Sequence, residues 1–239
     1  MTPQFDEIWV YLSASPLLGL TITLLAYQAA FWLYRCSGMN PLANPVLIAV
    51  TILVLLLTLT ATSYETYFAG AQFVHFLLGP ATVALAIPLY TQFSRVRALL
   101  LPVFAGLVAG SLTAALSAIV VARLFGASLP TQLSLAPKSV TTPIAMGIAE
   151  RIGGIPSLTA VLVIVTGILG AVGARYVLDA IKVRDPAIRG FAIGVASHGI
   201  GTARAFQVSE QAGAFAALAM GLNGALTALL LPLLAGWMR

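Results

Sequence analysis

Charged residues are scarce in this sequence. Only 8% of its 239 residues are Asp, Glu, Lys or Arg, whereas soluble domains carry about 25%. Hydrophobic residues make up 60% of the chain, and the mean hydropathy is +1.00. Long gaps separate the charges, for example from Glu7 to Arg35 and from Arg97 to Arg123. Each such gap can hold a membrane-spanning helix of about 20 residues. The composition therefore indicates an integral membrane protein.

Cysteine and histidine are also scarce. One cysteine, Cys36, and two histidines exclude an intramolecular disulfide and a cysteine metal cluster, and they are too few for a usual metal site. The sequence contains no GxSxG, GxxxxGK[ST] or HExxH motif. We therefore expect a protein that is not an enzyme and that has no cofactor and no metal. The net charge of +5 comes from helix ends and short loops, so we expect no nucleic-acid partner.

About eight hydrophobic segments follow one another, and they predict an all-α membrane protein. We expect one multi-pass domain over residues 1–239 in the lipid bilayer. The first segment follows no Lys or Arg and is too long for a signal peptide, so we expect the mature protein to retain it. The expected segments are 9–34, 45–60, 68–93, 99–124, 133–152, 155–178, 190–208 and 212–237.

Prolines and glycines predict broken or re-entrant helices around residues 78–88, 137–143 and 197–204. A shift of 60 residues superposes Thr142 and Glu150 on Thr202 and Glu210, which indicates internal repeats of the kind found in transporters. With eight full spans, four Lys or Arg fall on each side of the membrane, so the positive-inside rule gives no orientation. Re-entry of one segment would move most charges to one side, but the sequence does not identify that segment.

Two of these interruptions predict helix starts inside the membrane. Thr142 and Pro143 suit the cap and the first position of a half-helix that runs past Glu150. Thr202 follows a flexible Gly-Ile-Gly stretch, and a second half-helix is expected from Ala203 to Glu210. Two helix N-termini that meet near mid-membrane would bind an anion, because each carries about half a positive charge and unpaired N–H donors.

Basic side chains accompany both predicted helix starts. Lys138, Arg204 and His198 lie within apolar segments, where an ionisable group costs several kcal/mol and suggests a functional role. An arginine fork matches a carboxylate, and lysine offers a point charge. The hypothesis is a site for a small carboxylate. Its candidate residues are Lys138, Ser139, Thr141, Thr142, Pro143, His198, Gly199, Gly201, Thr202 and Arg204.

These candidates have alternative interpretations. Lys138 and Arg204 could instead pair with Glu150 or Glu210, or reach to the membrane surface and hold helices together. His198 could relay a proton, which would couple anion movement to protons, or it could be a hydrogen-bonded structural histidine.

Several motifs resemble the LrgB/CidB family of bacterial membrane proteins. The chain resembles that family from Leu77 onward, over roughly two-thirds of its length, and the longest matches are PKSVTTPIAM and SHGIGTARA. The motifs are LGPATVALAIPLY (78–90), PKSVTTPIAM (137–146), IGGIPS (152–157), TGILG (166–170), RG (189–190) and SHGIGTARA (197–205).

The resemblance implies a multi-pass protein of the bacterial inner membrane, with a small LrgA/CidA-like membrane subunit as partner and with homo-oligomerisation left open. The family is also similar to the carboxy-terminal half of the plant plastid glycolate/glycerate translocator, and bacterial relatives are linked to pyruvate uptake. We therefore predict a secondary transporter, or the larger subunit of one, for a small monocarboxylate such as pyruvate, glycolate or glycerate. The alternative implied by the family is an antiholin-like regulator of murein hydrolase export and autolysis.

Overall fold

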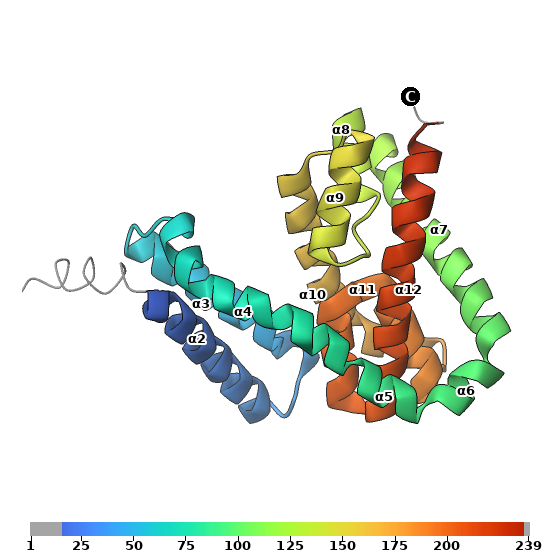
Figure 1. Cartoon of the computed structure of the whole chain (residues 1–239), viewed down its shortest axis with the longest axis horizontal. Helices are drawn as coiled ribbons and strands as arrows, with labels where there is room; N and C mark the ends of the chain where they lie inside the picture. The colour runs from blue at the N-terminus through green and yellow to red at the C-terminus, as the bar shows by residue number, and fades with distance from the viewer. Residues whose placement is uncertain (1–15, 237–239) are drawn as a thin grey trace, which may run out of the picture. The chain divides into compact units, whose positions relative to one another are not determined.

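The computed structural model describes residues 16–236, and within that range the secondary structure is helical and contains no strand (Figure 1). The prediction of an all-α membrane protein is confirmed. Four of the described helices are long and apolar enough to cross a membrane: α2 (Pro16–Cys36), α7 (Leu100–Leu124), α10 (Pro156–Ala180) and α12 (Glu210–Ala235). The chain forms two compact units that divide after Ala84.

The first unit consists of α2, a short 3₁₀ helix (Pro41–Ala43), α3 (Pro45–Leu59) and α4 (Tyr64–Ala84). Small residues let α2 approach its neighbours closely, because buried Ala26 and Ala30 pack against Ala49 of α3. The side chain of Asn44 accepts hydrogen bonds from the first N–H groups of α3, and Pro45 occupies the first turn, where no donor is needed.

The expected segment 68–93 is not one helix. It divides at Leu85 into α4 and α5 (Ala86–Thr91), and the short α6 (Phe93–Ala98) follows before α7. The interruption predicted around residues 78–88 is therefore present. Its physical cause is Pro88, which has no N–H to donate to the carbonyl of Ala84, four residues earlier, and whose ring would clash with that carbonyl.

The second unit is built around α7, α10 and α12. These helices have 25, 25 and 26 residues, so each is about 38 Å long at 1.5 Å per residue and exceeds the 30 Å or so of a bilayer core. Two shorter segments alternate with these long helices, and each turns back part-way through. Figure 1 shows the first of them near the end of α12 that leads to the C-terminus, and the second, α11, towards the other end.

The first of these segments, hairpin 1, consists of α8 (Leu129–Leu135), a non-helical stretch (136–141) and α9 (Thr142–Ile152). With 11 residues, α9 spans only about 16 Å, half of a bilayer core. The chain then returns to its starting level, because the N–H of Ile155 donates to Oγ of Ser134 at 2.7 Å and Oγ1 of Thr159 donates to the Ser134 carbonyl at 3.1 Å. Hairpin 1 is thus a re-entrant segment.

The interruption predicted around residues 137–143 is present in hairpin 1, but the helix start was placed one residue too late. Thr141, in extended conformation, occupies the cap position, α9 begins at Thr142, and Pro143 is its second residue. Both of the first two positions lack an intrahelical N–H partner, so proline fits either one.

The second turning segment, hairpin 2, is α11 (Pro186–Val208), which is broken at His198 with φ 40° and ψ −135°. A straight helix would place its ends about 33 Å apart, yet Pro186 and Val208 line the same hollow. A Cβ built on Gly201 would lie 3.1 Å from the carbonyl oxygen of Ile193, eight residues earlier. The chain therefore folds back at His198, and hairpin 2 is also re-entrant.

Two details of the prediction for residues 197–204 were wrong. The break is at His198, and residues from Gly199 to Val208 are helical, so the second arm starts before Ala203. Glu210 belongs to α12, because Ser209 is extended and caps that helix. The second arm starts earlier than predicted because Gly201 does not interrupt the helix. Instead, Gly201 allows the two arms of hairpin 2 to pack closely.

Candidate functional site at the hairpin tips

The tips of the two hairpins meet at Asn223 of α12. Its side-chain nitrogen donates to the carbonyl of Ser139 in hairpin 1 at 3.4 Å and to the carbonyl of Val195 in hairpin 2 at 3.0 Å. Asn223 lies close to the middle of α12, which runs from Glu210 to Ala235. The tips therefore meet at mid-membrane depth, where unwound backbone is tolerated only if it is buried in protein or lines a cavity.

Asn223 is fully buried and uses its oxygen as well. Ser111 of α7 donates to that oxygen at 2.5 Å, and Thr227 of α12 donates to it at 3.3 Å. One amide thus joins two long helices to both tips. A buried network in which every member has a partner fixes one arrangement, because each broken bond would leave an unsatisfied polar group.

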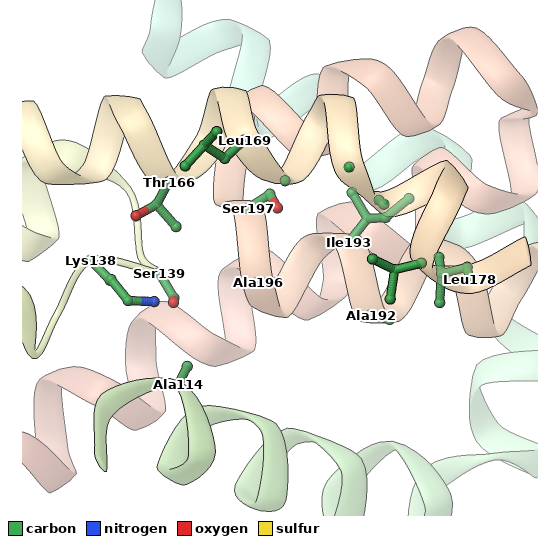
Figure 2. A pocket seen from close by; sticks show the side chains of 14 residues that line it. Ala114, Lys138, Ser139, Thr166, Leu169, Leu178, Ala192, Ile193, Ala196 and Ser197 are labelled. Carbon is green, nitrogen blue, oxygen red and sulfur yellow. The ribbon is translucent and has the colours of Figure 1, made fainter. Parts of the chain in front are cut away.

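Beside this network lies a cavity of about 550 Å³, the tip cavity. Figure 2 shows it between hairpin 1, α7, α10 and hairpin 2. Most of its wall is apolar, and its polar side chains are Lys138, Ser139, Thr166 and Ser197. Glycines on α10 make room for the second tip, since a Cβ on Gly170 would overlap the side chain of Ser197.

Lys138 and Ser139 are the two groups best suited to hold a ligand. Both side chains line the cavity and come from the tip of hairpin 1 (Figure 2). The Ser139 side chain is buried, and its Oγ has no hydrogen-bond partner among the described residues. Such an orphaned group costs about 1–3 kcal/mol unless something binds it. Within the described part of the chain, Lys138 forms no ion pair with Glu150.

The other candidates on hairpin 1 stand at the start of α9. Thr141 and Thr142 begin that helix together with Pro143, but none of the three lines the tip cavity. They place the free N–H groups of the α9 N-terminus close behind Ser139 in the chain, and a helix N-terminus carries partial positive charge.

His198 and Thr202 make structural contacts in hairpin 2. Nε2 of His198 lies 2.9 Å from the carbonyl of Val163 on α10, and a Cβ on Gly167 would clash with the imidazole ring. Because a carbonyl only accepts, this nitrogen carries the proton. Oγ1 of Thr202 donates to the carbonyl of His198 at 2.7 Å. Gly199 and Gly201 continue the second arm and do not line the tip cavity.

Arg204 is not at the tip cavity. It lines a second hollow, of about 670 Å³, and the two hollows share only Ala174 and Ile193 in their walls. Its guanidinium donates to Oε1 of Gln207 at 3.1 Å. The second arm of hairpin 2 turns back after His198, so it carries Arg204 about 9 Å along the helix away from the tip. The structure thus places the chain neighbours Lys138 and Ser139 at the tip cavity and Arg204 at the second hollow.

The chain matches the LrgB-like family over residues 23–237. It belongs to the LrgB-like family. The LrgB-like match includes both hairpins and every residue of the tip cavity. The resemblance noted from the sequence motifs is therefore confirmed.

Curated relatives cover nearly the whole LrgB-like chain. YxaC of Bacillus subtilis strain 168 is 35% identical over 214 residues, which are 90% of this chain and 93% of YxaC. YwbG of the same strain is 35% identical over 222 residues, 93% of this chain and 98% of YwbG. A Bacillus cereus strain B4264 protein named antiholin-like protein LrgB is 31% identical over 220 residues, 92% of this chain and 95% of that protein. No solved structure matches the chain.

Sequence reasoning missed four polar residues of this LrgB-like site. Thr166 and Ser197 lie inside quoted motifs, and Ser111 lies in an expected span, but hydroxyls are common in membrane helices. Asn223 carried a usable signal, because it is an amide in the middle of the apolar segment 212–237. Polar residues at that depth are expensive and mark functional or structural contacts.

Proposed function

We propose that this LrgB-like protein is a multi-pass protein of the bacterial inner membrane that transports a small monocarboxylate such as pyruvate, glycolate or glycerate. It acts as a secondary transporter or as the larger subunit of one. The observation that carries this proposal is the pair formed by Lys138 and the unpartnered hydroxyl of Ser139 at a cavity between two re-entrant tips. The proposal includes no chemical step on the substrate.

The composition of the cavity wall suits a small organic acid. Among the described residues that line it, Lys138 is the one charged side chain, so one negative charge is matched. Ser139 can donate to a carboxylate oxygen, and the nearby α9 N-terminus favours an anion. The remaining wall is mostly alanine, glycine, leucine and isoleucine, which suits the apolar end of pyruvate better than a second carboxylate, whose burial without a partner would be costly.

Two re-entrant tips at one cavity also suit alternating access. Transporters built from repeats bind substrate near the bilayer midplane, at discontinuous helices, and expose it to one side at a time. Hairpins 1 and 2 enter from opposite ends of the second unit, and Asn223 contacts both tips. Movement of either tip away from Asn223 would break one hydrogen bond to that amide.

The direct experiment is uptake of labelled pyruvate by purified protein in liposomes, with and without its small LrgA/CidA-like partner. Lys138→Gln should reduce uptake at least tenfold, because the tip cavity loses its positive charge. Lys182→Gln is the matched control, because Lys182 is exposed and lines neither of the two hollows. Equal uptake by the wild type and Lys138→Gln would refute the site, and absence of uptake by the wild type in both settings would refute transport.

A proton is the candidate coupling ion, and His198 is its candidate carrier. If the proton moves through this imidazole, His198→Gln should take up pyruvate at a rate that no longer depends on pH. An unchanged pH profile would leave His198 as a structural contact to Val163.

The name of the Bacillus cereus relative, antiholin-like protein LrgB, favours a second candidate function. The family resemblance implies that this function is control of murein hydrolase export and autolysis. The two functions separate in a deletion strain. If the protein is a regulator that does not transport, the Lys138→Gln variant should restore the normal autolysis rate to the deletion strain. If transport underlies any effect on autolysis, that variant should fail in both assays.

A further inference from the structure

The second hollow, of about 670 Å³, lies where α10 ends and hairpin 2 begins and ends. We call it the arginine hollow. Its charged lining residues are Arg175, Asp179, Arg184, Arg189 and Arg204. Apart from Arg204, three guanidinium groups thus face one carboxylate, which leaves two positive charges in the wall. The charged residues come from the end of α10, from the loop that follows it and from both arms of hairpin 2.

The single carboxylate is already shared. Asp179 contacts Arg189 at 2.6 Å and Arg175 at 3.8 Å. Other acidic groups close by in the chain are engaged elsewhere or exposed: Asp185 pairs with Arg95 at 2.7 Å and caps α11, and Glu210 is exposed at the start of α12. The positive charge of the wall is therefore not cancelled by a carboxylate that lines it.

Confinement makes this charge effective. The Arg189 side chain is only 20% exposed, and Arg204 is half-buried. A concave site lined by one sign of charge concentrates counter-ions, and guanidinium groups bind carboxylates and phosphates through two parallel hydrogen bonds. We propose that the arginine hollow is a second anion-binding site, which takes a carboxylate or phosphate group from a free small acid or from a lipid headgroup.

The position of this site suggests its role. Ala174 and Ile193 line both the arginine hollow and the tip cavity, so their side chains form the partition between the two. An anion bound in the arginine hollow would be separated from the tip cavity by these two side chains. This role as an outer station rests on the proposed function, whereas anion binding itself rests only on the charges of the wall.

Thiol labelling tests the site without any need for transport. Val208 lines the hollow and is 63% exposed, so Val208→Cys in a Cys36→Ser background reports on it. In phosphatidylcholine nanodiscs, a sulfonate-bearing methanethiosulfonate should react about tenfold faster than a trimethylammonium-bearing one, after correction for their rates with free thiol. Arg184→Gln should reduce this preference severalfold, and the loop control Lys182→Gln should not. Equal corrected rates would overturn the proposal.

Ligand protection distinguishes the two sources of the anion. Millimolar pyruvate that slows labelling in phosphatidylcholine identifies a free acid, and slower labelling in phosphatidylglycerol nanodiscs identifies a lipid headgroup. Protection by neither would overturn binding. If pyruvate protects Val208→Cys but liposomes show no uptake, the proposed transport function fails and the anion site stands. The opposite result is uptake by the wild type, an unchanged KM for pyruvate in Arg184→Gln, and no protection of Val208→Cys by either ligand. In that case the anion site fails and the proposed transport function stands.

Discussion

At the residue scale, the carbonyl and the hydroxyl of Ser139 at the hairpin 1 tip differ in hydrogen bonding. The carbonyl of Ser139 accepts a hydrogen bond from Asn223, while the Ser139 hydroxyl, equally buried, has no partner among the described residues. The first stabilises the fold and the second costs free energy. An unsatisfied buried hydroxyl is explained if a ligand binds it. Loss of the Ser139 hydroxyl should therefore not destabilise the fold, whereas loss of the hydrogen bond to the Ser139 carbonyl should.

Ser139→Ala should leave the protein as stable as the wild type, or up to about 1 kcal/mol more stable, because it removes an unsatisfied buried hydroxyl. The same change should raise the KM for pyruvate severalfold. Ser111→Ala is the matched control: it removes a hydroxyl bonded to Asn223 and should lower the Tm with a smaller effect on KM. Thermal unfolding in detergent and liposome uptake measure both quantities, and a marked fall in the Tm of Ser139→Ala would contradict this assignment.

Asn223→Ala should destabilise the protein by about 1–3 kcal/mol, since the carbonyls of Ser139 and Val195 and the hydroxyl of Ser111 lose their shared partner. Membrane proteins can show smaller values, because the unfolded state in the membrane also finds partners. Denaturation in mixed detergent micelles gives the free energy of unfolding. A value within about 0.3 kcal/mol of the wild type would show that water replaces the amide at no cost.

At the element scale, α10 presents a glycine face to hairpin 2. A Cβ on Gly170 would overlap Ser197, and one on Gly167 would overlap His198, whereas a Cβ on Gly173 meets nothing within 4 Å. These contacts hold the tip of hairpin 2 against the long helix. The hairpin itself depends on His198, whose positive φ is a conformation that costs a non-glycine residue about 1–3 kcal/mol.

Gly170→Ala should displace the hairpin 2 tip, reduce uptake at least tenfold and lower the Tm by several degrees. Gly173→Ala lies on the same helix and lines the same cavity, so it controls for the loss of a glycine, and it should behave like the wild type. Comparable behaviour of the two variants in uptake and thermal unfolding would mean that α10 does not position the tip.

At the scale of the second unit as a whole, two re-entrant hairpins account for the distribution of charge. The ion pair between Arg95 and Asp185 places these residues on one side, together with Arg97, Lys182, Arg184 and Arg189 near the same helix ends. The other side receives Arg123 and Arg151 at the ends of α7 and α9. The even division expected from full spans does not hold for this unit, and the positive-inside rule predicts that the arginine-rich side faces the cytoplasm.

Cysteines placed in a Cys36→Ser background test this topology. Phe125→Cys and Ser157→Cys flank hairpin 1 and should react from the same side of the membrane, while Ile181→Cys and Val208→Cys flank hairpin 2 and should both react from the cytoplasmic side. An impermeant maleimide applied to intact cells and to inverted vesicles reads the side. Labelling of Phe125→Cys and Ser157→Cys from opposite sides would show that residues 129–155 cross the membrane.

The amino-acid sequence by itself determined that the chain is an all-α membrane protein, because apolar runs of spanning length dominate it. It also located the interruptions within residues 78–88, 137–143 and 197–204, although it did not place the third break at His198. Only the tertiary structure decided which segments turn back and which side chains meet. Lys138 and Ser139 come together at a cavity, while Arg204 is carried to a separate hollow. That outcome depends on contacts between residues far apart in the chain, such as those of Asn223 with Ser139 and Val195, and local sequence patterns do not encode those distances.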